Sequence, residues 1–179
     1  NFEITKHKQG AIAWKALNQN SRFLMDLEGQ MESDGNIEYK VTLVARENAS
    51  VEDIGLRTHL APGIGRYMMG LGEKGGYCPN DLRWKWDVEK NQDGPWVGDV
   101  NAGLQIRFYD NKYERPLNTN FYHQKPLHMP LSWCNNGNGG IDINNASDGT
   151  RINAYSGKRE VKKGDKLYYY FNVAITPFR

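Results

Sequence analysis

An alternation of apolar and polar residues, repeated in segment after segment, is the feature that most constrains the fold of this chain. In the run from Ile37 to Val44, the odd positions through Leu43 are apolar and the even positions through Thr42 are polar. Successive side chains of a β-strand point to opposite faces, so this pattern predicts a strand with one face in a core and one in water. No window has the apolar spacing of an amphipathic helix, and we therefore expect no helix longer than about two turns.

Strand-like segments recur along the 179 residues, with turn-forming clusters between them. The strongest is Leu167–Ile175, a β-branched and aromatic run that Pro177 closes. We expect strands over 11–18, 22–31, 36–46, 54–60, 102–109, 140–145, 150–155 and 167–176, with a weaker candidate, Phe121–His123. Roughly ten or more short strands in a chain of this size are typical of one domain with two packed sheets. The predicted fold is all-β, a two-sheet antiparallel β-sandwich over residues 1–179.

A long aromatic-rich excursion interrupts this pattern between Arg66 and Gly103. It carries three of the five tryptophans, and neither helical nor ordinary strand periodicity explains it. Loops longer than about 12–15 residues tend to be functional or folded down as part of an interface. The letters GLGEKG at 70–75 match a dinucleotide-binding motif, but turn residues and Pro79 follow where a helix would have to begin. We therefore expect glycine-rich turns there, no nucleotide, and an interface role for the excursion.

Four aromatic residues of the excursion are candidates for contact with a carbohydrate or with another domain: Tyr77, Trp84, Trp86 and Trp96. Large aromatics alternate with charges over 83–87, which puts Trp84 and Trp86 on one strand face, where two indoles could form a stacking platform for sugar rings. Burial is the commoner fate of large aromatics, and this alternative stays open. Trp96 follows a Gly-Pro pair at a predicted turn, so we expect it to be the more exposed indole.

Charge and hydropathy exclude several kinds of partner. The 23 Lys and Arg nearly balance the 21 Asp and Glu, and the two signs are interspersed, which argues against nucleic acid as the main partner. No run approaches the ~20 apolar residues needed to span a bilayer, so we expect no membrane insertion. The first residues lack the apolar centre of a signal peptide, and the chain opens at Asn1. We expect a processed protein or an excised domain, from which an export signal could have been removed.

The sequence predicts no metal and no cofactor. Cys78 and Cys134 allow one disulfide at most, and their spacing leaves open whether they form it. The four histidines form no ligand pair at helical spacing, and the Asn-rich stretch at 135–149 departs from a calcium-binding loop. No nucleophile motif is present. Carboxylates that could act as a pair exist, but any soluble loop carries such residues: Asp81, Asp87, Asp93 and Asp99.

Several motifs occur in an order that carries a family resemblance. They are YMMGLG at 67–72, GGY at 75–77, WKWD at 84–87, WVGDVNAGLQ at 96–105, PLSW at 130–133, NGNGG at 136–140, AYSG at 154–157 and ITP at 175–177. With them the chain resembles, over most of 37–177, the N-terminal β-sandwich domain of bacterial glycoside hydrolase family 123-like proteins. The resemblance implies a (β/α)₈ barrel after the sandwich, in which an adjacent Asp-Glu pair hydrolyses N-acetylgalactosaminides by substrate assistance. This chain contains no Asp-Glu dipeptide, so the resemblance supplies no catalytic residue here.

Three interpretations of function follow. The resemblance favours an accessory, non-catalytic sandwich of a secreted, periplasmic or cell-surface glycan-degrading protein. Such a sandwich would pack on its own downstream catalytic barrel and help frame the glycan cleft through 66–103. A second interpretation is an independent carbohydrate-binding module that uses the four aromatic residues of the excursion. A third is a self-contained glycan-acting enzyme with an unrecognised carboxylate pair.

Overall fold

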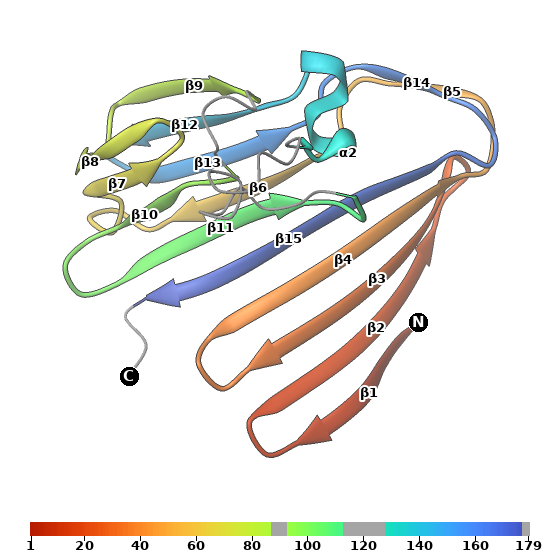
Figure 1. The fold of residues 1–179 in the computed structure, drawn as a ribbon, viewed down its shortest axis with the longest axis horizontal. Helices are drawn as coiled ribbons and strands as arrows, with labels where there is room; N and C mark the ends of the chain where they lie inside the picture. Colours follow the sequence, from red (N-terminus) through yellow and green to blue (C-terminus); the bar gives the residue numbers. More distant parts are fainter. Residues whose placement is uncertain (87–92, 113–127, 177–179) are drawn as a thin grey trace, which may run out of the picture.

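The computed structural model describes residues 1–86, 93–112 and 128–176, which form two antiparallel sheets packed face to face (Figure 1). Within the described residues the larger sheet has nine strands in the order β1-β2-β3-β4-β15-β11-β10-β7-β8. Their bounds are β1 (Phe2–Lys8), β2 (Ala11–Gln19), β3 (Phe23–Glu32), β4 (Asn36–Ala45), β7 (Tyr67–Gly70), β8 (Glu73–Tyr77), β10 (Trp96–Gly98), β11 (Gly103–Tyr109) and β15 (Lys166–Thr176).

The second layer is smaller. In the described part of the chain it has four strands in the order β6-β13-β12-β9, and a two-stranded ribbon joins β14 to β5 beside it. Their bounds are β5 (Ala49–Val51), β6 (Gly55–Leu60), β9 (Asp81–Lys85), β12 (Gly140–Ala146), β13 (Gly149–Tyr155) and β14 (Arg159–Val161). A short helix, α2 (Leu131–Cys134), continues into a 3₁₀ turn, η2 (Asn135–Gly137), at one end of the sandwich. The predicted all-β sandwich is confirmed.

The core lies between the small sheet and one half of the large sheet. Ile106 and Phe108 of β11 belong to one buried cluster with Ile141, Ile143 and Ile152 of the small sheet. Trp133 of α2 completes this cluster: it is 2% exposed, and its ring lies edge-on to Phe108 at 4.7 Å between centroids. Large apolar side chains excluded from water in this way supply the main driving force for folding.

The strands agree closely with the alternation in the sequence. The predicted ranges 11–18, 36–46 and 167–176 correspond to β2, β4 and β15, and each differs by a residue or two at its ends. The alternation in β6 is confirmed as well, because Leu56, Thr58 and Leu60 are half-buried while Arg57 and His59 are exposed. The predicted strand Phe121–His123 lies outside the described residues.

The described residues of the excursion form strands in both sheets, which corrects the expectation that strand structure does not explain it. Strands β7, β8 and β10 extend the large sheet, whereas β9 pairs with β12 of the small sheet. Tight turns between such short strands need positive φ, and Gly70, Leu71 and Gly72 have φ of 95°, 55° and 88°. The glycine-rich turns expected at this motif are therefore present.

The two sheets differ in width, and the second layer does not cover the whole of the first. The members of the central core cluster that belong to the large sheet come from β4, β15, β11, β10 and β7, and none comes from β1, β2 or β3. Figure 1 shows β1 to β4 running out beyond the small sheet. One face of β1, β2 and β3, together with the first residues of β4, therefore continues the core face of the sheet with no second layer above it among the described residues.

Candidate interaction surface

The uncovered part of the core face is apolar, and we call it the open apolar face. Ten side chains of β1–β4 on this side of the sheet make up the face: Phe2, Ile4, Ile12, Trp14, Ala16, Met25, Leu27, Met31, Ile37 and Tyr39. Most of them are half-buried against one another, while Phe2 and Ile4 on the edge strand are 67% and 54% exposed. Contiguous apolar surface of this kind marks interaction sites on proteins.

A continuous row of partners across six strands forms the centre of this face. The register aligns Ile4, Trp14, Gly29, Tyr39, Phe171 and Phe108 from β1 to β11. Tyr39 stacks on Phe171 with ring centroids 4.9 Å apart, and Trp14 meets Tyr39 edge-on at 5.8 Å. Cross-strand aromatic pairs stabilise sheets, so the row is a rigid continuation of the core. It runs from the fully buried Phe108 to the exposed Ile4.

Gly29 makes this arrangement possible. A Cβ atom at Gly29 would lie 2.1 Å from Cε2 of Trp14, so the indole rests directly on the backbone of β3. A strand glycine often marks such a close approach. The flat packing leaves one ring face of Trp14 directed away from the sheet, on the side where the open apolar face lacks a second layer.

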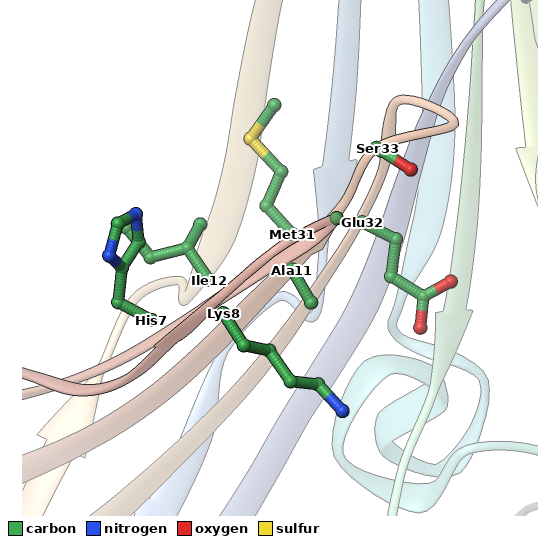
Figure 2. Close-up of a pocket in the computed structure, with 8 residues that line it drawn as sticks. His7, Lys8, Ala11, Ile12, Met31, Glu32 and Ser33 are labelled. Atoms are coloured by element: carbon green, nitrogen blue, oxygen red, sulfur yellow. The ribbon is translucent and has the colours of Figure 1, made fainter.

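The corner of the open apolar face lies where β1, β2 and β3 meet, beside a shallow cavity of about 300 Å³. Figure 2 shows Ile12, Met31 and His7 on one side of the sheet there, with Lys8, Ala11 and Glu32 on the other. Ile12 pairs with both His7 and Met31 in the register. The corner thus separates the apolar side of the sheet from its charged side.

The opposite side of the same strands is polar. Lys15 pairs with Glu28 at 2.5 Å, and Lys40 with Glu38 at 3.2 Å. The hydroxyl of Tyr109 donates to Glu38 Oε1 at 2.5 Å. Burial, together with this bond to Glu38, raises the pKa of Tyr109 above its usual range. The two faces of the large sheet therefore have different chemistry, and the apolar one suits a dry interface.

Trp84 and Trp86 do not form the stacking platform considered for them. They are 5% and 8% exposed and lie in the core, with their rings 4.9 Å apart in an edge-on arrangement. Trp86 also meets Phe108 edge-on at 6.5 Å between centroids. Their shared strand face points inward because β9 lies over the large sheet, so neither indole can offer a ring face to a sugar from outside.

Trp96 is half-buried and is therefore the more exposed indole of the three, as expected, but it lies in a strand and not in the turn that the Gly-Pro pair predicts. It belongs to β10, and its indole lies flat on Gly98 and Gly103, where a Cβ atom would come within 2.6 and 2.4 Å of the ring. Its Nε1 donates to Thr176 Oγ1 at 2.8 Å. The ring is thus fixed to the sheet by packing and by a hydrogen bond.

Tyr77 is the predicted aromatic residue that the structure does expose. It is 73% exposed on the edge strand β8 and stacks on Tyr67 at 5.3 Å between ring centroids. The guanidinium of Arg66 lies 5.2 Å from the Tyr67 ring and 5.9 Å from the Tyr77 ring, as in cation–π contacts. Tyr77 therefore lies on a different strand from Trp84. The side chains beside its ring belong to Tyr67 and Arg66, which the sequence analysis did not propose as contact residues.

Cys78 and Cys134 are free and buried, so the structure forms no disulfide between them. Burial raises the pKa of the Cys78 thiol. Within residues 1–86, 93–112 and 128–176, no three His, Cys, Asp or Glu side chains cluster so as to hold a metal ion. No helix in the same ranges has the length and apolar character to cross a membrane.

The fold and this surface define a class of protein: an all-β sandwich whose wider sheet leaves an apolar face uncovered. The comparison with family models identifies the family, because residues 1–177 match the third domain of glycoside hydrolase 123. The chain belongs to this family, which confirms the family resemblance. This family is named as the third domain of glycoside hydrolase 123, whereas the resemblance implied an N-terminal domain. A search of curated proteins found no match.

Several solved structures share this architecture, among them two named as an aldose epimerase homologue and a galactose 1-epimerase and one named as a heparan sulfate lyase. The GalM/aldose epimerase homologue from C. elegans has a TM-score of 0.55 and 7% identity, over 99% of this chain and 69% of that one. Galactose 1-epimerase from Lactobacillus acidophilus has a TM-score of 0.54 and 6% identity, over 100% of this chain and 67% of that one. A mutant of the heparan sulfate lyase HepC from Pedobacter heparinus has a TM-score of 0.50 and 6% identity, over 97% of this chain and 21% of that one. At such identities the likeness shows a shared fold alone.

Proposed function

We propose that this chain is a non-catalytic accessory sandwich of a glycan-degrading protein, and that it docks on the catalytic barrel of that protein through the open apolar face. Membership of a glycoside hydrolase domain family makes it a carbohydrate-related domain. The accessory role and the docking partner are the parts that we propose. A secreted or periplasmic location belongs to the same proposal.

The observation that carries the proposal is the one-sided exposure of the large sheet. Apolar side chains from β1 to β4 continue the core face, yet the small sheet does not extend over them. Removing apolar surface from water contributes about 25 cal/mol per Å², so a partner that covers this face gains a substantial driving force. The opposite side of these strands carries ion pairs already satisfied within the chain, such as Lys15–Glu28.

A domain of the same protein is the partner that fits best. The family model describes a third domain, and a third domain has companion domains in the proteins that it represents. A domain tethered in the same chain is present at high effective concentration, so a modest interface is enough to hold it. Interfaces between domains typically bury about 600–1,500 Å². The open apolar face is a better candidate for this interface than the excursion, because Trp84 and Trp86 of the excursion are buried in the core and cannot contact another domain.

The test compares two lysine substitutions on neighbouring strands in the longer parent protein. Ile4→Lys places a charge on the open apolar face, and Leu17→Lys places one on the opposite side of the sheet at a similar exposure, 54% against 49%. Burying the new charge at an interface is costly, so Ile4→Lys should detach the sandwich from the barrel. Leu17→Lys should leave it docked.

Hydrogen exchange gives the readout. Amides of β1–β3 should exchange more slowly in the parent protein than in the 179-residue chain, and Ile4→Lys should abolish this protection while Leu17→Lys retains it. Equal exchange in the parent and in the isolated chain would contradict the docking surface. So would an equal response to both substitutions.

A further inference from the structure

A polar pocket of about 300 Å³ lies at the end of the sandwich where α2 and η2 pack beside the start of β15. Its walls come from four parts of the chain that are distant in sequence: the end of β11, the α2–η2 segment, the first residue of β14 and the first residues of β15. None of the ten side chains of the open apolar face lines it. It is a separate feature, and the inference drawn from it does not depend on the docking function.

Hydrogen bonds fix the frame of this pocket. Ser132 Oγ accepts from the backbone N–H of Tyr168 at 2.8 Å, which ties α2 to β15. The amide of Asn135 donates to the carbonyl oxygens of Ser156 and Lys158 at 2.8 and 2.9 Å. These bonds hold the α2–η2 segment against its neighbours, so the shape of the pocket is set before any ligand arrives.

The acidic side chain in the wall is already satisfied. Asp110 is buried; its Oδ1 accepts from the N–H of Lys112 at 2.8 Å and its Oδ2 from the N–H of Leu131 at 2.5 Å. The carboxylate therefore joins the end of β11 to the start of α2. It is the single acidic residue among the described residues that line the pocket.

Three cations surround the same space. Lys112 and Lys166 are exposed, and neither forms a salt bridge with another described residue. Arg159 is half-buried: its Nη2 donates to the carbonyl oxygen of Ser132, and its guanidinium lies 5.8 Å from the ring of Tyr169. Its Nε is buried and has no hydrogen-bond partner among the residues that the structure describes. Burial also lowers the pKa of Arg159, so an anion beside it would offset a desolvated charge.

We propose that this pocket binds a sugar residue that carries a carboxylate or sulfate group. The anion would lie between Arg159, Lys112 and Lys166, because charge-assisted hydrogen bonds to such groups are the strong ones. The rest of the pocket suits a sugar ring, because the uncharged residues Asn136 and Tyr168 are also in its wall. The cavity volume lies at the lower end of the usual range for ligand sites. A cavity of this volume is larger than a carboxylate or sulfate group alone would fill.

Titration calorimetry on the whole 179-residue chain tests this proposal. The probes are glucuronic acid and sulfated glucose, with glucose as the neutral match and sodium acetate and sodium sulfate as the bare anions. We expect both acidic sugars to bind and glucose not to bind. Binding by only one acidic sugar would assign the anionic group. Equal affinity for the bare anions would overturn the sugar site and leave a simple anion site.

Substitutions locate the site. Lys112→Gln and Lys166→Gln should each weaken binding about two- to fivefold, as for one partly exposed charge pair. Asn136→Gly removes the amide at a residue whose φ of 55° glycine accepts readily, and should weaken binding of the sugars. Lys163→Gln is the matched control, since Lys163 is exposed and outside the pocket. Absence of binding by the folded wild-type chain, or an equal loss in the control, would overturn the proposal.

Discussion

Tryptophan on glycine is the packing device that recurs at the scale of single residues. Trp14 rests on Gly29 of the next strand, and Trp96 rests on Gly98 of its own strand and Gly103 of the next. A ring can lie flat on a sheet only where the residue beneath it has no side chain. The tryptophan and the glycine on the neighbouring strand lie 15 residues apart in the first case and 7 in the second. The alternation in the sequence predicts the strands, but it does not identify these partners.

Gly29→Ala should destabilise the chain because the new methyl group meets the indole of Trp14. Overpacking of this kind costs about 1–3 kcal/mol in the free energy of unfolding. Urea denaturation followed by tryptophan fluorescence measures the change. Gly76→Ala is the control: a Cβ atom there meets nothing within 4 Å, so the change should stay within about 0.5 kcal/mol. Equal losses in both variants would contradict the packing argument.

The raised pKa of Tyr109 makes the stability of the folded chain depend on pH in the alkaline range. Burial and the hydrogen bond to Glu38 raise its pKa above the ordinary tyrosine value of about 10. A raised pKa means that the folded state favours the protonated form, so this stabilisation is complete below about pH 10 and is lost as the pH rises further. The free energy of unfolding should fall above that pH, and Tyr109→Phe should reduce the slope. An unchanged slope in the variant would contradict the assignment.

At the scale of elements, strands with a clean alternation were predicted well, and irregular or very short elements were not. Strand β1 escaped prediction because its register shifts between Ile4 and Lys6, which breaks the alternation, and all its residues are exposed. Strands β7 to β10 are only three to five residues long. The helix α2 spans four residues, too few for a helical period to show. Elements of this length form because tertiary contacts hold them.

Deleting residues 1–9 should leave the sandwich folded. Strand β1 is an exposed edge strand that contributes nothing to the buried clusters. We therefore expect near-ultraviolet circular dichroism of the truncated chain to match that of the full chain. Trp133→Ala is the contrast, because it empties the centre of the core and should cost about 3–5 kcal/mol. Loss of the folded spectrum on truncation would show that β1 is needed for folding.

At the scale of the whole molecule, the unequal width of the two sheets determines where the surface is apolar. The core face of the large sheet extends over β1–β4, and among the described residues no side chain of β1, β2 or β3 packs into the central core cluster. The candidate surface is thus a part of the core face that no described residue of the second layer covers. This explains why Trp14 belongs to the candidate interface while Trp84 and Trp86 belong to the interior.

The sequence by itself determined the all-β class, the ranges of the long strands, the glycine-rich turns and the family resemblance. Each of these depends on residues close together in the chain, where the period of two and the turn-forming residues act locally. Only the tertiary structure decided which apolar faces are covered. Tyr39 and Trp84 both alternate with polar neighbours, yet one lies on the open apolar face and the other in the core. Coverage depends on the pairing of distant strands, a property that local patterns do not carry.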